Sequence, residues 1–208
     1  MAKTMIAPQA VMTDGQIENA LDKIRAAMRK HRAEISIDAA QQVLGVDNLG
    51  MLMFAPFRER AEAVSNLIVH KVKVNHSRTP QEALDATGRA QYTNCKVVDN
   101  MPRAAADEVE VVFFKPDLSE RNGYISDDDL EHEYELRGLT PADPISVAAV
   151  NEADPDFADR APHGTHWKDA DNKWNFAAFG HWLGERGVGV NRYNSIWDDG
   201  WWFAGVRK

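Results

Sequence analysis

The stretch THWKDADNKWNFAAFGHWLGERGVGVNRY, residues 165–193, decides the fold class of this chain. Its strand-like runs, rich in aromatic and β-branched residues, are separated by turn signals, and a fourth run follows near the C-terminus. The pattern predicts four antiparallel strands in a meander, at 165–168, 174–182, 188–193 and 201–207. Because such a sheet needs a cover for its second face, the sequence predicts an α+β fold in which helices pack on a Trp-rich antiparallel sheet.

Upstream of this region the apolar spacing is helical. Ile17, Leu21, Ile24 and Met28 recur at intervals of four, three and four, which predicts an amphipathic helix that starts at Asp14 and ends within 31–33. Either Thr13 or Asp14 provides its N-terminal cap. The cations Arg25, Arg29, Lys30 and Arg32 gather toward its C-terminal end, where they complement the helix dipole.

Two further helices are predicted in the first third of the chain. The first covers 37–44 and stops at Gly45, and the second covers 48–69 and is interrupted or entered at Pro56. The run Leu49, Met51, Leu52, Met53 and Phe54 is dense in large apolar side chains. We expect this run to be core, and the alternative is an oligomer contact.

The middle of the chain mixes strands and helices. Strands are predicted at 69–74 and 108–115, the second covered on both faces. One helix is predicted to start at the capping box formed by Thr79 and Glu82, and a second to cover 127–136 after the cap Ser126. A third is predicted to start at Thr140-Pro141.

The expected organisation has three parts. Residues 1–12 form a flexible tail, 13–160 a mainly helical region with an acidic centre, and 161–208 the Trp-rich β unit. We expect the last two to share one core, since the β unit is short, with 154–162 as the connector.

Charge is concentrated in the middle of the chain. Residues 105–160 hold 16 acidic and 4 basic side chains, and the whole chain has a net charge of -8. Such a segment repels a phosphate backbone, so direct binding to duplex nucleic acid is not expected. The acidic candidates for binding a basic partner are Asp127, Asp128, Asp129, Glu131 and Glu133. The alternative for these residues is helix capping and a solvated face.

The expected cellular compartment of the protein follows from its cysteine content and its hydropathy. The single cysteine, Cys95, has no partner for an intramolecular disulfide, and the sequence shows neither a long apolar run nor a signal peptide. We therefore expect a cytoplasmic protein that does not bind membranes.

Histidines and carboxylates near residue 165 suggest a weak metal site. His163 and His166 are three residues apart and Asp169 follows, a set that holds zinc when the fold brings its members together. The alternative is surface histidines beside a hairpin turn, and no cofactor is expected.

All six tryptophans lie between 167 and 202. Most are expected to be core, and those that face solvent would anchor a partner or stack on a ligand. The candidates for this exposed role are Trp182, Trp197 and Trp202.

The stretches LGVDNLGMLMFAPFRERAEAVSNLIV, GYISDDDLEHEYELRGLTPADP and WWFAGVRK resemble those of a family of uncharacterised bacterial proteins, and the likeness covers most of the chain. The resemblance implies a bacterial cytoplasmic origin and a specific fold. It carries no activity, cofactor or catalytic residue.

Three function classes follow. The leading hypothesis is a noncatalytic protein-interaction module with an acidic surface, in one version an imitation of nucleic acid, which binds a protein partner or forms a homo-oligomer. The second is a carbohydrate or small-ligand binder that uses exposed tryptophans. The third is a metal-dependent enzyme built on His163 and His166.

Overall fold

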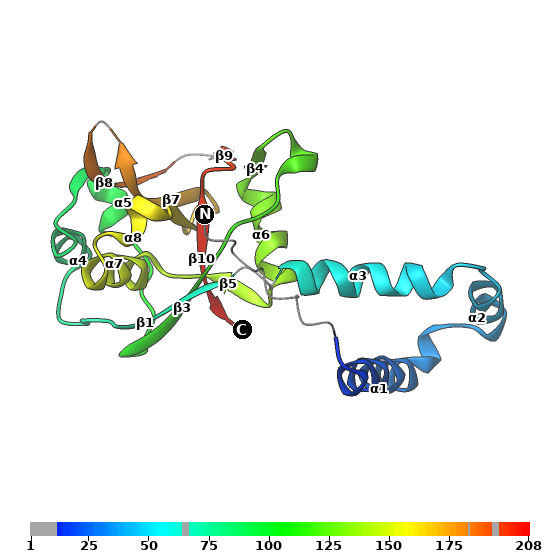
Figure 1. Ribbon diagram of the computed structural model, residues 1–208. Coiled ribbons are helices and arrows are strands. Elements are labelled where there is room, and N and C mark those ends of the chain that lie inside the picture. The colour runs from blue at the N-terminus through cyan, green and yellow to red at the C-terminus, as the bar shows by residue number, and fades with distance from the viewer. Residues whose placement is uncertain (1–11, 64–66, 183, 193–195) are drawn as a thin grey trace, which may run out of the picture. The chain divides into compact units, whose positions relative to one another are not determined.

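A computed structural model describes residues 12–208 apart from 64–66, 183 and 193–195 (Figure 1). The chain divides into two compact units, Met1–Ala55 and Pro56–Lys208. The tail expected at 1–12 lies outside the described residues except for its last one.

The first unit is helical. It contains α1 (Asp14–Lys30), a 3-10 turn η1 (Arg32–Glu34), α2 (Ile37–Leu44) and the first part of α3 (Leu49–Ala63). Thr13 caps α1 in a capping box with Gln16, and Ser36 caps α2. The bounds predicted for α2 are confirmed, and α1 starts at Asp14 as predicted but ends at Lys30, just before the expected 31–33. α3 continues through Pro56 and ends at Ala63, so the prediction that this helix reaches residue 69 is wrong: Ile68 and Val69 belong to a strand.

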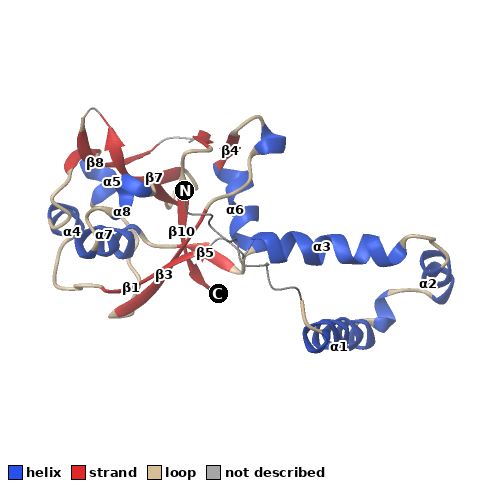
Figure 2. Cartoon of the chain, viewed as in Figure 1, coloured by secondary structure: helices blue, strands red, loops and turns tan. Residues whose placement is uncertain are grey.

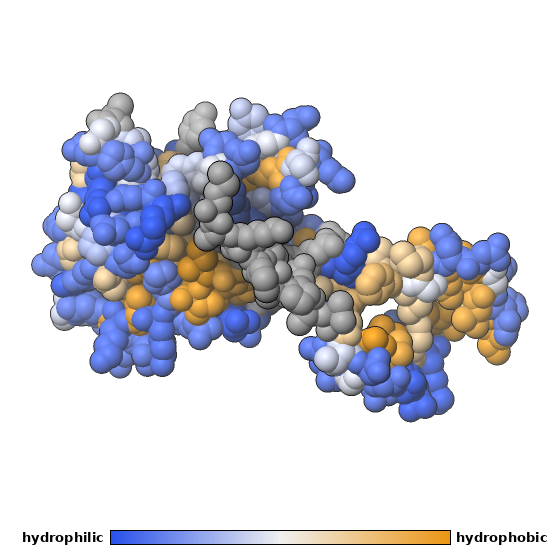
Figure 3. All heavy atoms as spheres, viewed as in Figure 1, coloured by the Kyte–Doolittle hydropathy of each residue, from blue (hydrophilic) through white to orange (hydrophobic). Residues whose placement is uncertain are grey.

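The packing of this first unit differs from the prediction. None of residues 12–55 is buried, and Met51, Leu52 and Met53 are exposed. The prediction that the run at 49–54 is core is therefore wrong. Figure 3 shows the consequence as apolar surface on these helices.

The second unit is built on an eight-stranded mixed sheet with the order β1-β3-β10-β6-β7-β8-β2, in which β5 also pairs with β10. A small second sheet pairs β4 with β9. The strands are β1 (Ile68–Lys73), β2 (Ala90–Thr93), β3 (Glu108–Phe114), β4 (Tyr124–Ser126), β5 (Leu139–Pro141), β6 (His163–Lys168), β7 (Trp174–Trp182), β8 (Glu185–Arg192), β9 (Ile196–Asp198) and β10 (Trp202–Arg207).

The α+β prediction is confirmed (Figure 2), but the meander is shorter than expected. β6, β7 and β8 pair antiparallel in sequence. β10 does not follow β8: it lies between β6, to which it is parallel, and β3, to which it is antiparallel. The sheet therefore contains strands that come before and after residue 161 in the sequence. Each of the two hydrophobic cores likewise contains side chains from before and after residue 161.

Helices and the small sheet cover the two faces of the large sheet. One core gathers side chains from α4 (Pro80–Asp85), α5 (Cys95–Val98), α7 (Pro144–Ala153) and α8 (Phe157–Arg160). The other gathers side chains from α6 (Asp127–Leu136), β4 and β9. As the alternation of β3 predicts, Val111 and Phe113 belong to the first core and Val112 and Phe114 to the second.

Two local predictions change in detail. Thr140-Pro141 does not open a helix: these residues belong to β5, and Asp143 caps α7 by accepting a hydrogen bond from the Ser146 amide. The connector expected at 154–162 contains the short helix α8, whose Phe157 is buried.

Candidate functional site

The acidic start of α6 lies partly inside the protein. Ser126 caps the helix, which turns Asp127 toward the sheet, and Asp127 is only 3% exposed. Its Oδ1 accepts hydrogen bonds from Nδ1 of His166 at 2.8 Å and from Nε1 of Trp197 at 3.0 Å. Asp128 and Asp129 of the same turn are exposed.

Glu133 is also buried. It pairs with Arg137 one turn later at 2.6 Å and faces Arg121 at 3.9 Å. The expectation that this run is a solvated acidic face is therefore wrong for Asp127 and Glu133. The reason is that each carboxylate meets a cationic partner inside the fold, which sequence spacing shows only for the pair four residues apart.

His166 lies between two carboxylates of α6. Its Nδ1 contacts Asp127, and its Nε2 lies 2.8 Å from Oε1 of Glu131. The second contact is an ion pair that lacks the alignment of a hydrogen bond. The imidazole ring also stacks on Trp174, with 4.4 Å between ring centroids and 13° between planes. We call Asp127, Glu131 and His166 the α6–β6 cluster.

The electrostatics of the α6–β6 cluster favour a charged imidazole. Burial lowers the pKa of His166, but its interactions with Asp127 and Glu131 outweigh burial, so the pKa of His166 lies above its ordinary value. The same contact with His166 lowers the pKa of Glu131, although burial opposes it. Because Glu131 is thereby a weaker base, the α6–β6 cluster fastens α6 to β6 and is poorly suited to accept a proton from a substrate.

The three metal candidates diverge. His163 lies on the opposite face of β6 from His166: its Nδ1 donates to the Ala161 carbonyl and its Nε2 accepts from Asn151, both at 2.8 Å. Asp169 accepts backbone hydrogen bonds in the hairpin turn and pairs with Arg192. The metal site suggested by these three residues is therefore not formed. Among the described residues, no group of three or more His, Cys, Asp or Glu side chains is placed to hold a metal ion.

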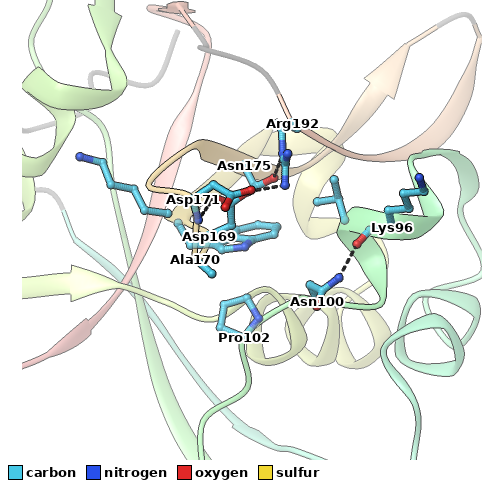
Figure 4. A pocket seen from close by; sticks show the side chains of 11 residues that line it. Lys96, Asn100, Pro102, Asp169, Ala170, Asp171, Asn175 and Arg192 are labelled. Atoms are coloured by element: carbon cyan, nitrogen blue, oxygen red, sulfur yellow. Dashed lines mark hydrogen bonds and ion pairs between the residues drawn. The ribbon is translucent and has the colours of Figure 1, made fainter.

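Beside the β6–β7 hairpin lie two adjoining hollows, of about 450 and 400 Å³, which share Pro102, Trp167 and Lys168. Figure 4 shows the first. Two of the polar side chains that line it are paired within the lining: Asn100 donates to the Lys96 carbonyl at 2.8 Å, and Arg192 pairs with Asp169. The second is lined by Glu131, Asp143, His166 and Trp174 as well. The lining of each hollow thus contains both cations and carboxylates, so neither hollow favours a ligand of one particular charge.

The tryptophan candidates are placed unequally. Trp197 is buried and lies against Gly164, where an added Cβ would come within 2.9 Å of its ring, so its predicted exposure is wrong. Trp182 and Trp202 are half-buried. The ring of Trp182 is tilted 54° from that of Trp201, and these two rings do not form the coplanar platform on which a sugar stacks.

The first unit presents a second candidate surface. Its exposed large apolar side chains, which we call the helical surface, are Met12, Ile17, Leu21, Met28, Ile35, Ile37, Val43, Leu44, Val46, Met51, Leu52, Met53 and Phe54. Sequence reasoning found the helical apolar spacing of α1 but assigned the run at 49–54 to the core. The signal that was available is the size of the segment, since a few short helices enclose little volume.

Comparison with protein-family models, with curated proteins and with solved structures found no match. Among the described helices, none has both the length and the apolar character that crossing a membrane requires.

Proposed function

We propose that this chain is a noncatalytic interaction protein that binds another protein chain through the helical surface. One observation carries the proposal: none of residues 12–55 is buried, although these residues include most of the large exposed apolar side chains of the described chain. Exposed apolar side chains gathered in this number mark protein interfaces, because leaving them in water is unfavourable.

The acidic segment has a smaller part in this proposal than the sequence suggested. Asp127, Glu131 and Glu133 are paired with His166 or Arg137 inside the second unit, so only Asp128 and Asp129 of the five are left for contact with a basic partner. Imitation of nucleic acid needs a dense array of outward carboxylates, and the burial of two of the five weakens that version. We also propose the bacterial cytoplasm as the location, since the only cysteine is a free and exposed thiol.

The proposal predicts that the helical surface is open in a dilute monomer and closes when a partner binds. The test measures thiol-labelling rates of Met51→Cys and Leu52→Cys in a Cys95→Ser background. Asn19→Cys, at an exposed position of α1, gives the rate of an open site, and Val98→Cys, at a position 1% exposed, gives the rate of a covered one.

In nanomolar protein we expect positions 51 and 52 to react as fast as position 19. A bacterial lysate should slow labelling at positions 51 and 52 about tenfold and leave position 19 unchanged. Labelling at 51 and 52 as slow as at position 98 in the dilute monomer would show that the chain covers its own apolar side chains. That result would overturn the proposal.

A further inference from the structure

We infer that the partner of the helical surface includes a second copy of this chain, with α1 of one copy packed antiparallel against α1 of the other. The inference rests on the proposed function and names the partner. Three features of α1 carry it: the spacing of its apolar side chains, the separation of its charges, and the small residues beside its apolar seam.

The apolar seam of α1 has the spacing of a coiled coil. Ile17, Leu21, Ile24 and Met28 occupy successive d, a, d and a positions of a heptad repeat. Ile17, Leu21 and Met28 are exposed, and Ile24 is only half-buried. The four positions are symmetric about the point between residues 22 and 23. An antiparallel pair therefore matches Ile17 with Met28 of the second copy and Leu21 with Ile24.

The charges of α1 are separated along its length. Asp14, Glu18 and Asp22 lie in the first half, and Lys23, Arg25, Arg29 and Lys30 lie in the second. Arg25 and Asp22 pair within the helix, where both side chains remain more than half exposed. A parallel pair of helices would place like charges side by side, whereas an antiparallel pair places the acidic half against the basic half.

The positions that flank the seam agree with this orientation. Glu18 and Arg25 both occupy e positions, which face each other when two helices run antiparallel, so each copy contributes to two opposite-charge pairs. Ala20 and Ala27 occupy the g positions on the other flank. Their small side chains allow close approach of the two helices. A 17-residue helix offers a seam of about 25 Å, so we expect a reversible dimer of micromolar affinity.

The first test is a charge exchange in the full chain, measured by sedimentation equilibrium. Glu18→Lys and Arg25→Glu each turn two attractive pairs into two repulsive ones, and each should weaken the dimer about tenfold. The double variant restores opposite charges and should recover the dimer. An equimolar mixture of the two single variants should form a heterodimer, since Lys at 18 then faces Glu at 25 and Arg at 25 faces Glu at 18.

Asn19→Lys is the matched control, because residue 19 is on the side of α1 opposite the seam and should leave the dimer unchanged. Circular dichroism of each variant checks that the helix is retained. Recovery in the mixture excludes simple unfolding of the single variants, since each then forms a dimer with the other. A mixture that stays as weak as its components would overturn the inference.

The second test reads the orientation by disulfide formation in a Cys95→Ser background. A mixture of Ala20→Cys and Ala27→Cys chains should cross-link between the two variants and do so faster than either variant cross-links with itself. Faster self-cross-linking of Ala20→Cys would show a parallel pair and overturn the inference. The inference would also be overturned if the protein stays monomeric at every concentration and only a lysate slows thiol labelling at positions 51 and 52. In that case the proposed function still stands.

Discussion

At the scale of single residues, two histidines on one strand have pKa values shifted in opposite directions. On β6, His163 faces the core that contains Phe113, Phe157 and Phe179, and burial lowers the pKa of His163 to about 3. His166 faces α6, and its carboxylate partners raise its pKa despite burial. Side-chain alternation along the strand places the two imidazoles in these different environments only three residues apart.

We expect the two histidines to change stability in opposite directions with pH. His163 has a folded pKa below its unfolded value of 6.5, so its contribution is present above pH 6.5 and is lost toward pH 3, at up to about 1.4 kcal/mol per pH unit. His166 has a folded pKa above 6.5, so its contribution is complete below pH 6.5 and is lost as the pH rises through the folded pKa.

Urea unfolding of the wild type, His163→Gln and His166→Gln between pH 5 and pH 9 measures both effects. The cost of His166→Gln should be about 3–5 kcal/mol near pH 6, because it breaks a buried pair, and should shrink toward pH 9. The cost of His163→Gln should instead grow as the pH rises from 5 to 7. A parallel pH dependence of the two costs would contradict the opposite directions of the two pKa shifts.

Two glycines of the large sheet leave the space that Trp182 occupies. A Cβ added at Gly180 or Gly187 would lie 2.6 or 2.8 Å from the indole ring. We therefore expect Gly180→Ala and Gly187→Ala each to lower the free energy of unfolding by about 1–3 kcal/mol, since the ring must move from its packed position. Urea unfolding followed by tryptophan fluorescence measures the loss.

Gly189→Ala is the control for these two variants, because a Cβ there meets its nearest atom at 3.9 Å, in ordinary contact. This substitution should be neutral or stabilising by up to about 1 kcal/mol, since alanine loses less backbone entropy than glycine on folding. An equal loss in all three variants would mean that the glycines matter for backbone freedom and not for the indole.

At the scale of elements, the sequence predicts what depends on neighbouring residues. The caps Thr13, Thr79 and Ser126 begin their helices as expected, because a cap and the amides that it satisfies are within three residues of each other. The alternation of β3 likewise shows that both its faces are covered.

The placement of β10 depends on partners far away in sequence. Its pairs with β3 join residues about ninety positions apart, and Gly205 permits the approach of β5, where an added Cβ would lie 3.0 Å from the Thr140 carbonyl. The α6–β6 cluster was missed for the same reason. Its histidine and its carboxylates were each noticed in the sequence, but only the fold brings His166 to Asp127 and Glu131.

At the scale of the whole molecule, the two units differ in what holds them together. All the buried side chains of the two cores belong to residues after Pro56, and all six tryptophans do as well. None of residues 12–55 is fully buried, and few of them are even half-buried. A unit without a fully buried side chain adds little to the stability of the rest, since hydrophobic burial is the main favourable contribution to folding.

We therefore expect a chain of residues 56–208 to fold without the first unit. Its near-ultraviolet circular dichroism, which reports the packed tryptophans, should match that of the full chain, and its free energy of unfolding in urea should agree within about 1 kcal/mol. Sedimentation equilibrium should show it as a monomer at concentrations where the full chain dimerises. Loss of the tryptophan signal would mean that the large sheet needs residues 1–55, whereas a dimer of equal affinity would place self-association on the second unit.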